Sequence, residues 1–374
     1  MAQTSDGSDN GSGARKGLTV HGGNLNAAEA VFGDPGPQGW LDLSTGINPD
    51  PWPIPVLGSD RVLGSQVWTR LPDPSLEQGF LTAFRAAEAP LAAPPLDCLM
   101  AVPGLQAALQ LLPPVLAARK ERDPASLKVL VAHPSYGGHR EGWAAWGCAV
   151  KAVRDPLDDP ALDDADIVVL VHPNNPDGRR WPLERVQALG QQLARKDGCV
   201  LLDEAYVAPG EVDSLLCRVQ RDTADGAGLI VLRSFGKFFG LPGIRLGVVA
   251  AAPDLIAALR IKMGAWPVSG PALAIGTAAH ADLDWIARTK HGLVHRRDIT
   301  DRVLAEAGLD VGGGTDLFCL VQHPHAGKIF EQLGRCGVLV RAFTPEMGSS
   351  LLRFGLPSEK AMDRFVTVLS KLHI

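Results

Sequence analysis

The chain has 374 residues, of which 46% are hydrophobic and 21% charged, and its formal net charge is −5. This composition is typical of a soluble globular protein, and the slightly acidic balance argues against a basic surface for nucleic acid. No apolar run approaches the roughly eighteen residues that a membrane span needs. We therefore expect a cytoplasmic protein without nucleic-acid or membrane partners, with either two to three domains or one large domain and a smaller companion.

The N-terminal residues argue against a signal peptide, and the cysteines argue against a zinc-binding or disulfide-linked protein. Residues 1–17 are rich in Ser, Gly, Asp and Asn and lack the apolar stretch of a signal peptide, so we predict a disordered tail. The six cysteines form no C-x-x-C pair, which argues against a zinc ribbon or a disulfide framework and favours buried thiols. His291 and His295 are four residues apart in a predicted helix, but no third ligand stands at metal-binding spacing, and we expect no metal site.

The middle of the chain alternates short apolar runs with amphipathic helical stretches. The expected strands are Cys98–Val102, Lys128–Ala132, Ile167–Val171, Val200–Asp203, Leu229–Arg233 and Leu246–Ala250. Near-continuous apolar strands between helices indicate a mostly parallel sheet that is covered on both faces. The sequence therefore predicts an α/β domain here.

The C-terminal part mixes helices with shorter strands. Helical patterns are expected over Pro271–Ala307, His325–Cys336 and Ser358–Leu372, and strands over Leu317–Val321, Val338–Arg341 and Leu351–Gly355. This mixture is typical of a smaller α+β domain, which we expect the N-terminal segment to join.

Four polar motifs follow one another in the α/β domain. They are His-Pro-Asn-Asn-Pro-Asp-Gly (His172–Gly178), Asp-Glu-Ala-Tyr (Asp203–Tyr206), Ser-Phe-Gly-Lys (Ser234–Lys237) and Arg245. Each is expected at or just past the carboxyl end of a strand, which is the edge where open α/β sheets bind ligands. Singly, they fit a turn, a helix cap or a surface loop, but the ordered set indicates a binding site.

This ordered set resembles the fold-type I enzymes of pyridoxal 5'-phosphate, the aspartate-aminotransferase-like family, with its motifs N-P-x-G, D-x-x-Y, S-x-x-K and a downstream Arg. The resemblance covers nearly the whole chain and implies a large domain with a mostly parallel sheet plus a smaller α+β domain. It implies a tail over 1–17, an arm over 18–50 that contributes to the small domain and active site, a cofactor domain over 51–265 and a small domain over 266–374. It also implies a homodimer with the site at the interface.

The resemblance assigns chemical roles to the motif residues. Lys237 would bind the cofactor aldehyde covalently and then move protons, and Asp203 would keep the pyridine nitrogen protonated so that the ring accepts electrons. Asn175 and Tyr206 would hydrogen-bond the phenolate oxygen of the cofactor. The expected ligands of the phosphate and of the ring face are Gly104, Leu105, Gln106, Tyr136, Ser234 and Arg245. For Tyr136, a packing role in the core is the alternative.

The ends of the chain narrow the resemblance. His21-Gly-Gly-Asn24 and Leu41–Pro49 are similar to the N-terminal signature of the L-threonine O-3-phosphate decarboxylases, a subgroup that serves cobalamin biosynthesis. Membership would imply conversion of this small phosphorylated amino acid to (R)-1-amino-2-propanol O-phosphate. The expected substrate ligands are His21, Gly22, Gly23, Asn24, Asn48, Asn175, Arg341 and Arg353. Taken alone, His-Gly-Gly-Asn would be an ordinary flexible arm.

The two arginines near the C-terminus, Arg341 and Arg353, are suited to bind substrate anions. A planar guanidinium binds carboxylate or phosphate with two parallel hydrogen bonds. Arg353 aligns with the Arg that binds the substrate carboxylate in the family. For Arg341, binding of a substrate anion and exposure to solvent at the surface remain equal alternatives. A bond at the substrate α-carbon breaks when it stands perpendicular to the cofactor ring. Our hypothesis is that Arg341, Arg353 and the 21–24 arm clamp the phosphate and thereby turn the carboxylate out of the plane.

Three alternatives compete with this interpretation. A histidinol-phosphate aminotransferase also handles a phosphorylated amine, and the His21–Asn24 arm argues against it only by resemblance. A regulator fused to a DNA-binding helix-turn-helix lacks support, because the N-terminal tail is too short for such a module. A scaffold with a decayed site is opposed by the intact Lys237 and Asp203. The sequence leaves open whether the preferred substrate is threonine phosphate or serine phosphate. It also leaves open which residue takes the role of the Tyr that relatives often have at the position of Leu71.

Overall fold

The computed structural model describes residue 18 and residues 22–54, 64–220, 226 and 228–373. The tail expected over residues 1–17 lies outside these residues, as does His21. The chain forms two compact units: unit 1 comprises the described residues of Met1–Asp50, Pro176–Gly178 and His291–Ile374, and unit 2 those of Pro51–Asn175 and Arg179–Lys290. The division falls at His291 and not at the expected residue 266, because α10 (Gly270–Ala281) packs against α4 (Pro74–Glu88) within unit 2.

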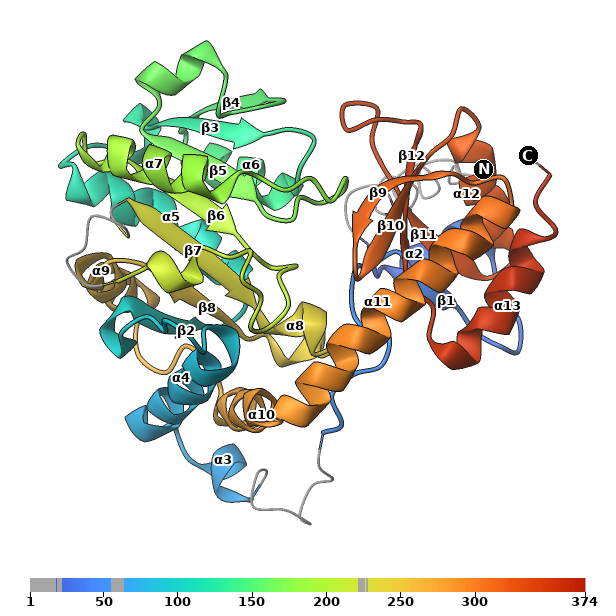
Figure 1. Cartoon of the computed structure of the whole chain (residues 1–374), viewed down its shortest axis with the longest axis horizontal. Helices are drawn as coiled ribbons and strands as arrows, with labels where there is room; N and C mark the ends of the chain where they lie inside the picture. The colour runs from blue at the N-terminus through green and yellow to red at the C-terminus, as the bar shows by residue number, and fades with distance from the viewer. Residues whose placement is uncertain (1–17, 19–21, 55–63, 221–225, 227, 374) are drawn as a thin grey trace, which may run out of the picture. The chain divides into compact units, whose positions relative to one another are not determined.

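Unit 2 is built on a seven-stranded sheet with the order β2-β8-β7-β6-β5-β3-β4 (Figure 1). The strands are β2 (Leu99–Val102), β3 (Lys128–Ala132), β4 (Ala149–Val153), β5 (Ile167–Val171), β6 (Cys199–Asp203), β7 (Leu229–Ser234) and β8 (Gly247–Ala250). Strands β7, β6, β5, β3 and β4 run parallel, and β8 is antiparallel to both of its neighbours. The mostly parallel sheet is thus confirmed.

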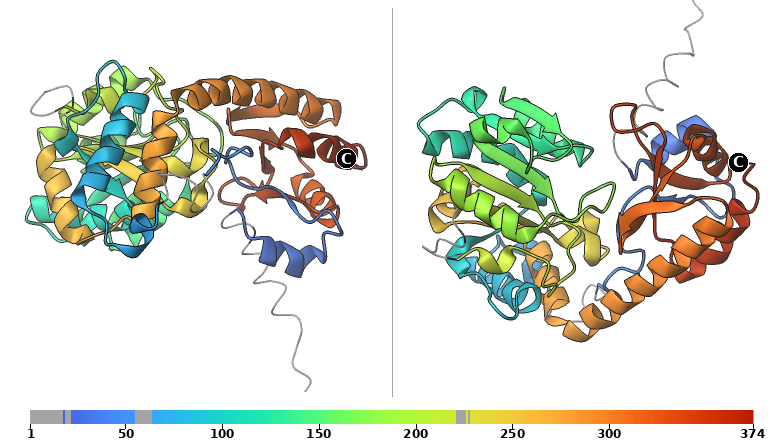
Figure 2. Two further views of the ribbon diagram at one scale, coloured as in Figure 1. Left: turned by 90° about the horizontal axis from the view of Figure 1, so that it is seen from below. Right: turned by 45° about the horizontal axis from the view of Figure 1, so that its top comes forward.

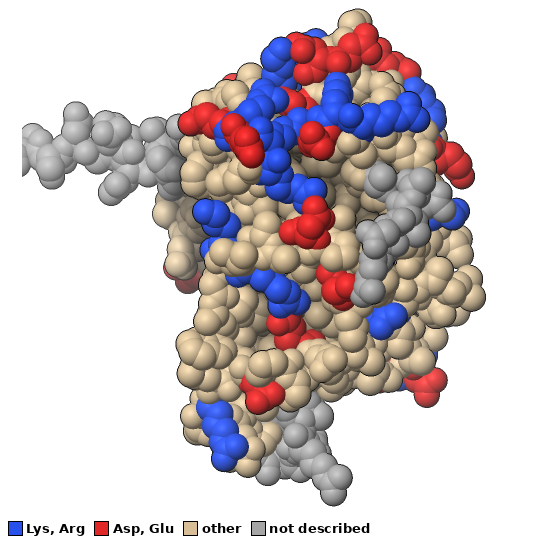
Figure 3. Space-filling view, turned by 90° about the vertical axis from the view of Figure 1, so that its left-hand side faces the viewer, with Lys and Arg blue, Asp and Glu red and all other residues tan. Residues whose placement is uncertain are grey.

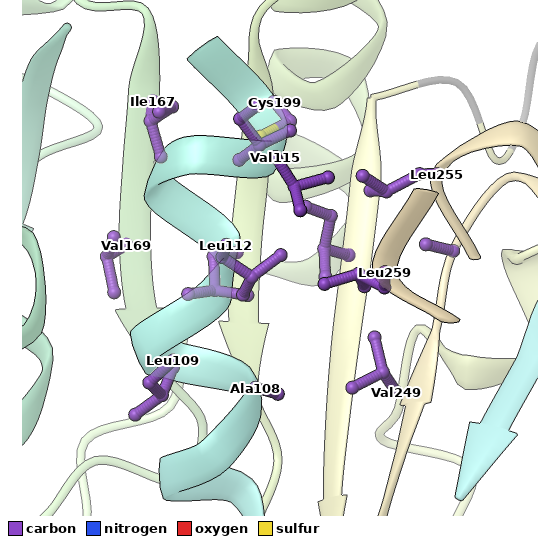
Figure 4. Close-up of a cluster of buried hydrophobic side chains, with 14 of the residues drawn as sticks. Ala108, Leu109, Leu112, Val115, Ile167, Val169, Cys199, Val249, Leu255 and Leu259 are labelled. Atoms are coloured by element: carbon purple, nitrogen blue, oxygen red, sulfur yellow. The ribbon is translucent and has the colours of Figure 1, made fainter. Parts of the chain in front are cut away.

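Helices cover both faces of this sheet. On β5, Ile167 and Val169 lie in a core with side chains of α5 (Leu105–Arg119) and α9 (Pro253–Met263), as Figure 4 shows. Val168 and Leu170 point to the opposite face because side chains alternate along a strand, and they are equally buried. This two-sided burial explains the continuous apolar runs of the sequence.

The remaining helical elements of unit 2 connect or flank these strands. The α-helices are α3 (Gln66–Thr69), α6 (Gly137–Ala144), α7 (Leu183–Ala194) and α8 (Phe235–Phe238), and the first eight residues of α11 (Leu283–Glu306) also belong to it. Short 3-10 helices span Leu96–Cys98, Pro124–Ser126, Pro160–Asp164, Leu216–Arg218 and Pro242–Ile244.

Unit 1 is a five-stranded sheet with the order β1-β11-β12-β10-β9 and flanking helices. Its elements are α2 (Leu25–Phe32), β1 (Leu41–Leu43), β9 (Val311–Thr315), β10 (Phe318–Gln322), α12 (Ala326–Arg335), β11 (Val338–Ala342), β12 (Leu351–Gly355) and α13 (Glu359–Leu369). The N-terminal strand β1 pairs in parallel with β11. The later part of α11 lies along this sheet (Figure 2), where Arg297 donates to the carbonyl oxygens of Gly313 and Thr315.

The expectation that all six cysteines are buried is wrong for two of them. Cys336 is exposed and Cys217 is partly exposed, whereas Cys98, Cys148, Cys199 and Cys319 are buried. Cys336 directly follows α12 at the position that caps the helix. It therefore lies at a helix end and not among the apolar side chains of a helix face.

Charged side chains of both signs share the molecular surface. On the face in Figure 3, Lys and Arg lie among Asp and Glu. In unit 2, Asp166 binds both Lys120 and Arg122, and Arg119 pairs with Asp254. None of the helices in the described parts of the chain combines the length and the apolar character that a membrane span requires.

Candidate active site

The polar motifs of unit 2 gather at one edge of its sheet. Asp203 ends β6, Ser234 ends β7, and the loop with Asn175 follows β5, so these parallel strands place them at the same edge. Arg245 corrects our expectation, because it precedes β8 and does not follow a strand. Since β8 is antiparallel to β7, its beginning lies at that edge as well, and the Phe235 N–H donates to Leu246 O at 3.2 Å.

The carboxylate of Asp203 is buried and held by two donors. Its Oδ2 lies 2.8 Å from His139 Nε2, and its Oδ1 accepts from the Ala205 N–H at 2.9 Å. The sequence interpretation missed His139, whose side chain is fully buried. The available signal was its position in α6, three residues after Tyr136, which places both side chains on one face of the helix start.

Tyr136 lies beside this pair. Its ring meets the His139 ring edge-on at 5.7 Å between centroids, and its hydroxyl donates to Gln106 Oε1 at 3.2 Å. Burial and the nearby Asp203 charge raise the pKa of Tyr136 above its usual value. The Tyr136 side chain is therefore a neutral phenol close to the Asp203 carboxylate.

The lysine motif meets the tyrosine of the aspartate motif. Lys237 lies in the short helix α8, and its Nζ is 5.6 Å from the centroid of the Tyr206 ring. The structure thus brings together Lys237, Tyr206, Asp203 and Tyr136, which come from three separate segments of unit 2.

Gly104 and Arg245 form a cradle at the beginning of α5. Gly104 has a φ of 78°, and a Cβ there would lie 2.4 Å from Arg245 Nη2, so only glycine lets the guanidinium approach. Arg245 itself has a left-handed backbone with a φ of 54°. Helix α5 begins at Leu105, and no side chain caps its first turn. A helix N-terminus with an adjacent guanidinium is suited to a phosphate group.

In unit 1, Arg341 on β11 and Arg353 on β12 stand directly opposite each other. Arg353 is buried, and its Nη2 donates to Ser44 O at 2.8 Å, while Arg341 Nη1 donates to Leu18 O at 3.1 Å. Burial and the Arg353 charge lower the pKa of Arg341 to about 10. This pair of like charges favours an anion between or beside them.

The N-terminal arm packs next to Arg353. The Gly23 N–H donates to Ser44 Oγ at 2.7 Å, and Ser44 Oγ donates to Asp42 Oδ1 at 2.6 Å. Two amide oxygens of the expected substrate ligands already accept bonds within unit 1: Asn24 Oδ1 caps α2 from the Ala27 N–H, and Asn48 Oδ1 accepts from the Asp50 N–H.

The Asn175 loop is fastened at its beginning by His172, a residue that the sequence interpretation left without a role. His172 is buried, its Nδ1 accepts from the Trp181 N–H at 3.1 Å, and its Nε2 lies 3.1 Å from Asp213. Burial lowers the pKa of His172 despite the opposing effect of the Asp213 charge. A neutral imidazole with its proton on Nε2 satisfies both contacts.

Together these residues form two chemically distinct groups, one in each unit. Unit 2 holds a lysine, a buried carboxylate and an anion cradle, and unit 1 holds two opposed arginines beside the N-terminal arm. Among the residues that the structure describes, no three His, Cys, Asp or Glu side chains are arranged to hold a metal ion.

Comparison with known proteins connects this arrangement to a family. Residues 94–369 match the profile of aminotransferase class I and II. The chain belongs to this family. Its members use pyridoxal phosphate, which is accordingly the cofactor of this chain.

Two relatives align with almost the whole chain. A threonine-phosphate decarboxylase of Sinorhizobium sp. is 37% identical over 346 residues, which are 92% of this chain and 95% of the relative. A threonine-phosphate decarboxylase of Pseudomonas aeruginosa is 35% identical over the same shares of both chains. The solved structure of histidinol-phosphate aminotransferase from Sinorhizobium meliloti in complex with pyridoxal-5'-phosphate has a TM-score of 0.70, covers 100% of both chains and is 20% identical, which confirms the fold.

Proposed function

We propose that this protein is a pyridoxal-phosphate-dependent decarboxylase of L-threonine O-3-phosphate. The reaction releases carbon dioxide and leaves (R)-1-amino-2-propanol O-phosphate, the linker used in cobalamin biosynthesis. The observation that carries the proposal is the opposed pair Arg341 and Arg353 beside the 22–24 arm, because this substrate has two anionic groups. The two relatives aligned over 92% of the chain support the choice of substrate.

The residues at the sheet edge of unit 2 fit the cofactor. The cradle of Gly104, Arg245 and the first turn of α5 suits its phosphate, since it offers a cation and free main-chain donors where no Cβ intrudes. We assign Ser234, Leu105 and Gln106 to the same phosphate group, and Tyr136 to the face of the ring. When bound, pyridoxal phosphate supplies an electron sink for the pair released at the substrate α-carbon.

The side chains of unit 2 then have separate tasks. Lys237 would hold the cofactor aldehyde and would act as the proton carrier to the substrate α-carbon. Asp203 would hold a proton on the pyridine nitrogen, and His139, with its Nε2 2.8 Å from Asp203 Oδ2, orients that carboxylate. We assign Tyr206 and Asn175 to the phenolate oxygen, and Asn175 also to the substrate.

The arginines of unit 1 decide which bond is presented for cleavage. We propose that two arginines of unit 1 and the N-terminal arm bind the substrate phosphate, which would leave the carboxylate free for cleavage. The residues are Arg341, Arg353, His21, Gly22, Gly23 and Asn24, and Asn48 would support them. A substrate held by its second anion leaves the carboxylate free to take the position that cleavage requires. The main-chain N–H of Gly23 is already committed to Ser44, so the arm contributes through its other groups.

Two parallel assays of purified protein with pyridoxal phosphate test the proposal. Carbon dioxide release is measured with threonine phosphate and with serine phosphate, and amino transfer is measured with 2-oxoglutarate. We expect carbon dioxide from threonine phosphate, and a preference of about 10- to 200-fold over serine phosphate if an apolar pocket holds the extra methyl group. Amino transfer without carbon dioxide would overturn the assignment.

We further propose that the protein acts as a homodimer. Trp68 (53%), Leu71 (65%) and Trp266 (58%) are among the strongly exposed large apolar side chains of unit 2. Homodimers are typical of the family to which the chain belongs, and a second copy of the chain would cover these side chains. Light scattering on the purified protein is expected to give the dimer mass, and Leu71→Glu is expected to shift it toward the monomer.

A further inference from the structure

Beneath the cofactor edge, unit 2 buries four ionisable side chains that our mechanism does not use. We call Glu88, Glu204, Arg233 and His280 the buried quartet; their exposed fractions are 8%, 0%, 3% and 2%. Buried ionic groups are tolerated only when charges and hydrogen bonds compensate one another, because desolvation of each ion is costly. The arrangement of the quartet therefore reports which protonation states the fold requires.

Arg233 is the centre of the quartet. It donates from Nη2 to Glu88 Oε2 and from Nη1 to Glu204 Oε2, the latter at 3.2 Å. Nη2 also donates to Val207 O at 3.1 Å. Arg233 thus bridges two carboxylates that come from different elements, α4 and the segment after β6.

Both carboxylates are surrounded by donors. Glu204 accepts from Ser214 Oγ at 2.5 Å and from the Leu215 N–H at 2.7 Å, in addition to Arg233. Burial raises the pKa of Glu204, but every contact at its oxygens comes from a group that can donate, as a carboxylate requires. For Glu88, burial is outweighed by the charge of Arg233 and by His280, which together lower its pKa.

His280 faces an acceptor with each ring nitrogen. Nδ1 lies 2.8 Å from Gly276 O, and Nε2 lies 3.3 Å from Glu88 Oε1. Only the imidazolium form has a proton on both nitrogens and can donate twice. With His280 as a cation, the quartet contains two positive and two negative charges and is electrically neutral.

The quartet is directly connected to cofactor-binding residues. Arg233 precedes Ser234, and Glu204 follows Asp203. Phe235 and Phe239, which flank Lys237, stack on each other at 4.6 Å, and the His280 ring lies 5.7 and 4.7 Å from their centroids. His280 therefore touches both aromatic rings that bracket the lysine.

We propose that His280 is a positioning residue that, as the imidazolium, neutralises the buried quartet and thereby fixes the segment from Ser234 to Lys237 for the cofactor. The charges that face it are those of Glu88 on α4 and Arg233 on β7. Without the His280 cation, the quartet carries one uncompensated negative charge among side chains that are at most 8% exposed. The segment that carries Lys237 would then shift to relieve that charge.

A charge-balanced double variant tests this proposal. His280→Gln and Glu88→Gln each unbalance the quartet, whereas the double variant removes one charge of each sign and leaves Arg233 paired with Glu204. Affinity for pyridoxal phosphate is measured by titrating apoprotein and following tryptophan fluorescence, and stability by the melting temperature of the apoprotein. We expect each single variant to bind about tenfold more weakly or worse, and the double variant to recover to within about threefold of the parent.

Lys120→Gln is the matched control, because Lys120 and Asp166 form a largely buried pair (side chains 8% and 12% exposed) at the opposite edge of the sheet. It is expected to lower the melting temperature and leave the cofactor affinity unchanged. Losses that add up in the double variant, or single variants that melt lower but bind the cofactor normally, would overturn the proposal. If the single variants fail to fold, a folded double variant supports it and an unfolded one contradicts it. The affinity measurement is independent of whether the enzyme releases carbon dioxide.

Discussion

The two units treat charge in opposite ways. In unit 2, each buried charged group near the cofactor edge faces a partner of opposite sign or a donor, as Arg233 does with Glu88 and as Asp203 does with His139. In unit 1, two cations, Arg341 and Arg353, face each other across neighbouring strands, and the pKa of Arg341 is lowered to about 10 by burial and by Arg353.

This difference indicates how each unit meets its ligand. Compensated charges hold side chains in place before a ligand arrives, so the proposed cofactor site of unit 2 would be preorganised. In unit 1, the charges of Arg341 and Arg353 repel each other, so an anionic substrate bound there, as we propose, would add a compensating negative charge. Variants that change either the compensated charges of unit 2 or the opposed arginines of unit 1, but not both, test this difference between the units.

The largest effect is expected from Lys237→Ala, which would remove the proposed covalent link to the cofactor and the proposed proton carrier of unit 2. The visible absorbance of the lysine-bound cofactor should disappear, and carbon dioxide release should fall by at least about 10²–10⁴-fold, the usual contribution of a positioned acid or base. Spectra and stopped assays with and without added cofactor are the measurements. Retained visible absorbance would contradict the assignment of Lys237.

Replacement of Arg353 by Met tests the opposite property in unit 1. Because a charge-assisted pair is typically worth about 1.5–3 kcal/mol, we expect KM for threonine phosphate to rise about 10- to 100-fold, with cofactor affinity unchanged. The ligand-free protein should still fold, and substrate should stabilise it less than it stabilises the parent protein.

Arg341→Met sharpens this test of unit 1. At neutral pH, far below the lowered pKa of about 10, Arg341 carries its charge against Arg353. Removal of that charge should leave the melting temperature of the ligand-free protein equal or higher, while KM rises. A clear loss of stability without ligand would show that the arginine pair is structurally compensated, as the groups of unit 2 are.

A smaller effect is expected from His139→Phe in unit 2. Asp203 keeps its main-chain donor from Ala205 but loses the ring N–H at 2.8 Å, so kcat should fall about 10- to 100-fold. The spectrum of the bound cofactor should change its pH dependence, because Asp203 then holds the pyridine proton less firmly. An unchanged pH profile would mean that His139 serves packing alone.

The sequence predicted the parts of the fold that leave a local signal. Strands such as Ile167–Val171 are buried on both faces and therefore appear as continuous apolar runs. Strand β4, at the sheet edge, has mostly exposed or partly exposed side chains and lacked such a run, and β9 contains three consecutive glycines, which favour a loop prediction. The compact units divide at His291 and not at the expected residue 266, and the packing of α10 on α4 is a long-range contact that neither segment reveals alone.

Prediction of the candidate site from the sequence has the same limit, because residues outside the motifs leave no local signal. Lys237, Asp203 and Arg245 belong to motifs, and the structure places these motifs at one edge of the sheet, whereas the role of each residue is a proposal. His139 belongs to no motif, and only the approach of α6 to the end of β6 brings it to Asp203. The buried quartet also escapes prediction, since Glu88, Glu204 and His280 are far apart in sequence and each alone resembles a surface residue.

The smallest expected effect concerns a compensated charge of unit 2 that lies away from the ligand edge. Burial alone would raise the pKa of Asp166, but hydrogen bonds from Lys120 and the Lys128 N–H lower it below its ordinary 3.8. A carboxyl group with a lowered pKa in the folded state stabilises the protein above the pKa of the unfolded chain, and this stabilisation is lost as pH falls through the folded value. Asp166→Asn should therefore lower the melting temperature by about 2–6 °C at pH 7, and the deficit should shrink as the pH approaches and passes below 4.

Asp164→Asn, at an exposed pair with Lys128, is the control and should change the melting temperature by less than about 1 °C. Equal deficits at pH 7 and pH 3.5 would show that Asp166 contributes through packing or main-chain geometry and not through its charge.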